Sequence, residues 1–145
     1  MASIGSELKT YLKTINAVTT LIGAGTVARI YQHSAKQAIA MPYVLIEVFI
    51  GTSNQHINGI SGIATNRIQI DAYAATETEA YALAEAIRLA PLQMFRGTMG
   101  ATTVHGVSST EGYESGYEPP VKGGNQKRYF FSRDYFVTYS EAVTA

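Results

Sequence analysis

The sequence contains no cysteine and no tryptophan, and charged residues make up only 15% of it. The absence of cysteine excludes a disulfide scaffold, a cysteine-ligated zinc site, a thiol nucleophile and thiol redox chemistry. Neither charge is in excess, since 11 Lys and Arg side chains balance 11 Asp and Glu. Dedicated nucleic-acid-binding proteins usually carry a basic excess, so the balance argues against that class. A net charge near zero also leaves little self-repulsion and favours association.

Long hydrophobic runs are absent as well. The longest apolar run, residues 44–50, is interrupted by Glu47, and it is far shorter than the roughly 20 residues that cross a bilayer. The first six residues lack the basic and apolar regions of a secretory signal. We therefore expect a soluble protein made in a cytoplasm, without a membrane partner. A length of 145 residues with 46% hydrophobic side chains predicts one folded domain, residues 1–145.

Two segments have the apolar spacing of helices. The first predicted helix covers residues 6–21, bent near Asn16, and its apolar positions are Ile4, Leu8, Tyr11, Leu12, Ile15, Val18 and Ile22. The second begins with Thr76-Glu77-Thr78-Glu79, a capping box in which a hydroxyl and a carboxylate satisfy free backbone N–H groups. It continues to about Ala90, with an apolar stripe at Ala80, Leu83, Ala84 and Ile87.

The remaining periodicity is that of strands. Residues 43–50, 67–73, 102–108 and 129–140 are predicted strands, and residues 28–31 are a short candidate. In the first of these the even positions are branched aliphatics that indicate a core face, while Tyr43, Leu45 and Phe49 make the odd face unusually apolar. The fold class is α+β: an antiparallel sheet of about four to five strands, with two helices packed on one face and a long hairpin arm before the last strand.

Two extended loops complete this prediction, residues 51–63 and residues 110–126. The second has 17 residues, with four glycines and two of the chain's four prolines. Structureless loops of this length are uncommon in compact domains and are usually functional or disordered. Its acids precede its bases, and two tyrosines lie among the acids. The loop is either an arm that reaches a neighbouring subunit, which we favour, or a mobile surface hairpin.

Candidate chemistry is sparse, and we predict no catalytic, cofactor-binding or metal site. Residues 23–28 match the letters of a dinucleotide-binding turn, but a helix precedes them and a strand follows, which reverses the required order. His33, His56 and His105 lack the spacing of a metal site. Asp71 and Asp134 lie in mid-strand, so cross-strand pairing with Arg67 or Arg133 is expected of them. Residues 122–133 combine cations with aromatics, as a groove for nucleic acid would, although strand packing explains the aromatics better.

An ordered series of motifs over residues 8–139 resembles the phage tail-completion, or tail-terminator, family of head–tail joining proteins. After the first helix come residues 16–23 and Arg29-Ile30-Tyr31, and then Met41-Pro42-Tyr43-Val44 leads into a strand that ends in Gly51-Thr52. The series continues with Gly59-Ile60-Ser61-Gly62, with Arg67-Ile68-Gln69-Ile70-Asp71-Ala72-Tyr73-Ala74, with the second helix, and with Arg128-Tyr129 through Val137. The region around Glu118-Pro119-Pro120 is longer than expected for the family.

The resemblance implies a structural virion protein rather than an enzyme, with no cofactor. Such proteins form a ring, usually a hexamer, that caps the tail tube, stops its polymerisation and docks the head connector. Its partners would be other copies of the chain, the tail tube protein and the connector, while DNA passes through the lumen without specific binding. The expected location is the tail neck of the virion, after assembly in the host cytoplasm. A head-side connector ring is the alternative, followed by a nucleic-acid-binding module.

The unusually apolar strand face and the arm are the expected interface with other subunits, the tail or the connector. The predicted interface residues are Tyr43, Leu45, Phe49, Glu111, Tyr113, Glu114, Tyr117, Glu118, Lys122, Lys127 and Arg128.

Overall fold

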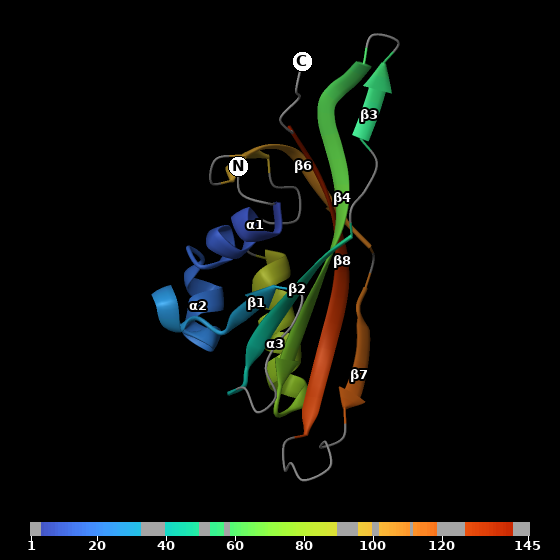
Figure 1. Cartoon of the computed structure of the whole chain (residues 1–145). Helices are drawn as coiled ribbons and strands as arrows, with labels where there is room; N and C mark the ends of the chain where they lie inside the picture. The colour runs from blue at the N-terminus through green and yellow to red at the C-terminus, as the bar shows by residue number, and fades with distance from the viewer. Residues whose placement is uncertain are drawn as a thin grey trace.

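In the computed structural model, one twisted sheet carries all the helices on one of its faces (Figure 1). The structure describes residues 4–32, 40–49, 53–56, 59–89, 96–99, 102–110, 112–118 and 127–140. The helices are α1 (Ile4–Leu12), α2 (Asn16–Ile22), α3 (Glu77–Ile87) and the short 3₁₀ helix η1 (Gly25–Val27). The strands are β1 (Ile30–Gln32), β2 (Tyr43–Phe49), β3 (Ser53–His56), β4 (Gly59–Ala74), β5 (Gly97–Met99), β6 (Thr102–Ser109), β7 (Glu114–Glu118) and β8 (Arg128–Ser140).

Two long strands, β4 and β8, form the centre of the sheet. The strand order is β1-β2-β4-β8-β6-β5, with β3 paired to β4 and β7 paired to β8. Strands β4 and β8 pair with each other along one edge. Because both are long, each also pairs with two shorter strands along its opposite edge. Strand β4 pairs with β2 over Arg67–Tyr73 and with β3 nearer its start, while β8 pairs with β7 at its start and β6 nearer its end.

The first predicted helix is divided in two, and the bend near Asn16 is confirmed. Helix α1 ends at Leu12 and α2 begins at Asn16. Between them the N–H of Thr14 donates to the carbonyl of Tyr11 at 2.9 Å, and the Thr14 hydroxyl donates to the same carbonyl at 2.6 Å. A side chain that bonds to the preceding turn competes with helical hydrogen bonding, which explains why the helix stops here.

The predicted cap of α3 is confirmed. The Thr76 hydroxyl accepts a hydrogen bond of 3.2 Å from the N–H of Glu79, as the capping box requires. The buried face of α3 consists of the predicted stripe, Ala80, Leu83, Ala84 and Ile87. This face packs on β4 and β8, so α3 is the helix that fixes the orientation of the two central strands.

The core lies between the helices and the inner face of the sheet. Helices α1 and α2 contribute Leu8, Leu12, Val18 and Ile22, all of them fully buried. The sheet contributes the predicted alternation, Val44, Ile46, Ile68, Ile70 and Ala72, and also Tyr135. Burying each large aliphatic side chain stabilises the fold by about 1.5–3 kcal/mol, so this single layer accounts for most of the hydrophobic stabilisation.

The predicted α+β class is confirmed, and the sheet differs from the prediction in its details. The sheet has eight strands, because β3, β5 and β7 lie in segments of low strand propensity that pair with a longer neighbour. The predicted loops 51–63 and 110–126 therefore contain strands, and the arm before the last strand is a β7–β8 hairpin of the chain's own sheet. The sheet is not wholly antiparallel either, since β1 runs parallel to β2. None of the helices in the described ranges has the length and apolarity to span a bilayer.

Candidate assembly surfaces

The face of the sheet opposite the helices carries a second set of large side chains. We call it the helix-free face, since within the described ranges the helices pack on the other side (Figure 1). Cross-strand register places its residues in rows: Tyr43, Tyr73 and Phe130; Leu45, Asp71 and Ser132; Glu47, Gln69 and Asp134; Phe49, Arg67 and Phe136. The surface is therefore a mixture of aromatic, acidic and polar side chains.

An aromatic row crosses three strands at one end of this face. Tyr43 stacks on Tyr73 with ring centroids 4.8 Å apart, and Phe130 follows at 5.6 Å from Tyr73. The ring of Phe130 extends over Gly116 of β7, where an added Cβ would lie 2.7 Å from the ring. Burial, followed by the nearby carboxylate of Asp71, raises the pKa of Tyr73, so its hydroxyl remains protonated. The row is tightly packed, and its residues stabilise the sheet.

Asp71 is a buried carboxylate with a structural role. It is 4% exposed, and its Oδ1 accepts hydrogen bonds from the Ser132 hydroxyl and, at 2.9 Å, from Nε2 of Gln69. The predicted pairing with Arg67 or Arg133 is wrong. Arg67 lies over the ring of Phe49, and Arg133 projects from the opposite face of β8. Strand spacing explains the error, because Arg67 is two rows away from Asp71.

The row Phe49–Arg67–Phe136 is the most exposed apolar part of the helix-free face. The guanidinium of Arg67 lies 4.1 Å from the centroid of the Phe49 ring. Phe49 and Phe136 are 38% and 37% exposed. Arginine and aromatic residues are enriched at the centres of protein interfaces, so this row fits a contact with another protein.

A polar pocket of about 280 Å³ opens beside this row. Its lining comes from β4, β8, the chain between β6 and β7, and the first residue of β7: Gln69, Thr110, Gly112, Tyr113, Glu114, Ser132 and Asp134. Two carboxylates, those of Glu114 and Asp134, belong to this lining, and within the described ranges no cation forms an ion pair with either. The pocket therefore has negative charge available for a partner.

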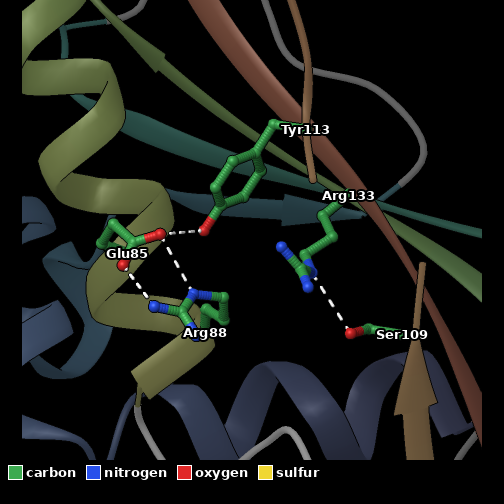
Figure 2. Close-up of polar contacts among 5 residues, drawn as sticks. All are labelled: Glu85, Arg88, Ser109, Tyr113 and Arg133. Atoms are coloured by element: carbon green, nitrogen blue, oxygen red, sulfur yellow. Dashed lines mark hydrogen bonds and ion pairs between the residues drawn. The ribbon is translucent and has the colours of Figure 1, made fainter. Parts of the chain in front are cut away.

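On the helix side, a cluster of polar contacts fixes the start of β7 to α3 (Figure 2). The Tyr113 hydroxyl donates to Oε1 of Glu85 at 2.7 Å, and Arg88 donates to both oxygens of that carboxylate at 3.0 and 2.6 Å. Arg133 lies 5.1 Å from the centroid of the Tyr113 ring and donates to the Ser109 hydroxyl at 3.2 Å. The hydrogen bond from Arg88 chiefly lowers the pKa of Glu85, with a further contribution from Tyr113. Burial and the bond to Glu85 raise the pKa of Tyr113.

The rings of Tyr81, Tyr113 and Phe131 pack edge to face around this cluster, with centroids 5.4–6.1 Å apart. Such aromatic pairs add about 0.5–1.5 kcal/mol each beyond their buried area. The described part of the predicted arm is thus anchored on its own subunit at Tyr113.

The eleven predicted interface residues occupy different environments. Tyr43 is buried in the aromatic row, Leu45 is half-buried and Phe49 is exposed. Glu114, Tyr117 and Lys127 are exposed, while Glu118 and Arg128 face each other across the β7–β8 hairpin. Glu111 and Lys122 lie outside the described residues. The register thus places one acid and one base of the arm, Glu118 and Arg128, at opposite positions of a hairpin within one chain.

The sequence did not single out Tyr73, Phe130 or Phe136 as surface residues. All three follow from strand alternation once the register of β4 and β8 is known. The register of β8 also bears on the predicted groove for nucleic acid. Arg128 and Arg133 lie on opposite faces of the strand, so they do not line one groove. Core packing accounts for Phe131, as expected.

The remaining candidate sites are the glycine-rich turn at residues 23–28 and the three histidines. Gly23 ends α2 and β1 follows η1, so the dinucleotide-binding order is absent in this segment. His105 is exposed beside the Ser140 hydroxyl at 2.8 Å, and His33 and the side chain of His56 lie outside what the structure describes. No three His, Asp or Glu side chains among the described residues gather as metal ligands.

Comparison with known proteins gives a family and a fold. Residues 6–91 match the family described as tail completion protein gp17. A comparison with curated proteins found no match. Among solved structures, a chain of one titled "Virion of native gene transfer agent (GTA) particle" is similar, with a TM-score of 0.65 and 14% identity over 95% of each chain. At this identity the likeness concerns the fold, and it extends through β5–β8, beyond the family match.

Proposed function

Because the chain belongs to the tail completion protein gp17 family, a family of structural proteins of the phage virion, we propose that it forms a ring at the end of the tail tube. The ring, a hexamer by resemblance, ends tail polymerisation and provides the surface on which the head connector docks. Its partners are further copies of the chain, the tail tube protein and the connector. It acts in the neck of the virion, without catalysis, after assembly in the host cytoplasm.

The observation that carries this proposal is the family match, and the shape of the subunit supports it. A ring with one type of contact needs two different complementary surfaces on each subunit. This chain offers a helix-free face with exposed Phe49 and Phe136 on one side, and a helical surface with exposed Tyr81 and Leu89 on the other. In this proposal the remaining predicted interface residues lie at contacts between subunits or with the tail.

DNA must pass through such a ring without being held. The formal net charge of zero and the separation of Arg128 from Arg133 on β8 both fit a lumen that binds DNA weakly. A head-side connector ring is the second candidate, since the same surfaces could serve on either side of the joint. The same separation speaks against a nucleic-acid-binding module.

The test is to isolate tails assembled without this protein and to add the purified chain. We expect negative-stain images to show ring-shaped ends, tails of fixed length, and binding of heads only after the addition. Rings that attach to purified heads but not to tails would support the connector instead. A chain that binds neither, and whose affinity for DNA falls steeply with salt, would refute both.

A further inference from the structure

We propose that the helix-free face of one copy binds the α1 side of the next copy, through ion pairs between Glu114 and Asp134 on one subunit and Lys9 and Lys13 on the other. The inference rests on the proposed ring and deepens it by naming the contact between neighbouring subunits. Each step of the argument uses the charges and positions of described residues.

The receiving surface is the pocket that contains Glu114 and Asp134. Glu114 is exposed on β7, and Asp134 lies two positions beyond the residue that pairs with Glu114 on β8. Both side chains line the same pocket, and in the described part of the chain neither has an ion-pair partner. Glu47 adds a third carboxylate on this face, in the same row as Asp134. The described cations of this face lie away from the pocket: Arg67 lies over the ring of Phe49, and Arg128 lies opposite Glu118 in the β7–β8 hairpin.

The complementary surface is on α1. Lys9 is in the last turn of α1 and Lys13 follows one turn later, so the two ammonium groups lie on one face of the helix end. The described residues supply no carboxylate to either lysine. Arg96, exposed just before β5, adds a cation at the strand against which α1 packs. Within the described ranges, the subunit therefore has an acidic surface and a basic surface without ion-pair partners, although its formal net charge is zero.

The two surfaces cannot meet within one subunit. Helix α1 packs on the helical side of the sheet (Figure 1), whereas the strand register places Glu114 and Asp134 on the helix-free face. A contact between different surfaces of identical subunits is heterologous, and repeated copies of it close into a ring when the rotation allows. The exposed rings of Phe49 and Phe136, beside the pocket, supply the apolar area that a stable interface requires.

Charge reversal on the two surfaces tests this contact directly. One variant carries Lys9→Glu with Lys13→Glu, and the other carries Glu114→Lys with Asp134→Lys. Each variant alone brings like charges together at every contact, so we expect few or no rings on tail tubes and at least a tenfold weaker self-association by sedimentation velocity. Mixed in equal amounts, the two variants can alternate around the ring, and every contact then regains opposite charges. We expect the mixture to restore ring formation.

The control carries Glu77→Gln with Glu79→Gln, which removes two exposed charges at the start of α3, outside the pocket. It should assemble like the wild type, while Glu114→Gln with Asp134→Asn should assemble about tenfold more weakly. Circular dichroism checks that every variant is folded. The contact is refuted if either reversal variant assembles like the wild type, or if two folded variants fail to restore rings when mixed. If the wild-type chain itself forms no rings on tails, the proposed ring is wrong and the contact falls with it.

Discussion

Replacing Tyr113 with phenylalanine removes one hydroxyl and leaves its ring between Tyr81 and Phe131. The lost hydrogen bond of 2.7 Å has the ionised carboxylate of Glu85 as its acceptor. Hydrogen bonds to charged groups contribute about 1.5–3 kcal/mol, and this bond is only partly buried, so the low end applies. We expect the free energy of unfolding to fall by about 1.5 kcal/mol. For a chain of this length that corresponds to a melting temperature lower by about 5 °C.

Equilibrium unfolding in urea measures this loss, with unchanged m-values as the check that both folded states are equally compact. Tyr117→Phe is the matched control, because Tyr117 lies on β7, which follows Tyr113, and is 46% exposed, so its change should cost less than about 0.5 kcal/mol. A double-mutant cycle with Glu85→Gln should give a coupling energy of about 1 kcal/mol. Additive effects, or a Tyr113→Phe variant as stable as the wild type, would refute the assignment of this contact as the anchor of β7.

Three further predictions concern the cap of α3, the buried layer and the carboxylate of Glu85, and the same urea titration measures all three. Thr76→Ala removes the cap of α3 and should cost about 1 kcal/mol. Thr78→Ala, two residues after the cap, should be nearly neutral. Leu83→Ala empties part of the buried layer and should cost about 2–5 kcal/mol, against less than about 0.5 kcal/mol for the 66% exposed Leu89→Ala. The pKa of Glu85 is lowered in the folded state, so its contribution to stability is present above its ordinary value of 4.5 and is lost as the pH falls through the lowered value. Glu85→Gln should therefore lower the free energy of unfolding at pH 7. If the variant and the wild type differed by the same free energy in strong acid, the lowered pKa of Glu85 would be wrong.

The sequence predicts those elements whose own pattern is strong. The stripe of α3, the cap at Thr76 and the alternation of β2 and β4 are local signals that the structure confirms. The sequence does not predict strands β3, β5 and β7, because they contain Gly, Ser and Asn, which favour turns, and Glu, which is depleted in strands. Strands β3 and β7 pair with the excess length of β4 and β8, and β5 pairs with β6, so all three depend on tertiary contacts that no local window contains.

The candidate surfaces were only partly predictable for the same reason. Phe49 could be identified, because it is an aromatic residue on the less buried side of a strand with a clear alternation. The hydrogen bond of the Tyr113 hydroxyl to Glu85 spans a sequence separation of 28 residues, so no local pattern predicts it. Side chains on β8 could not be assigned to a face until the register with β4 was known, which left Phe136 and the pocket beside it unrecognised.

The family match includes only one of the two surfaces that we propose to bind each other. The match ends at residue 91, so it includes α1, β2 and β4 but neither β7 nor β8. Strand β8 nevertheless pairs with β4 along twelve positions, so the sheet of the matched region is incomplete without it. The basic surface of α1 thus belongs to the matched region, while Glu114 and Asp134 lie beyond it. If these two surfaces bind each other, a change of charge on β7 or β8 must be accompanied by a compensating change on α1, since like charges at every contact of a ring would oppose its closure.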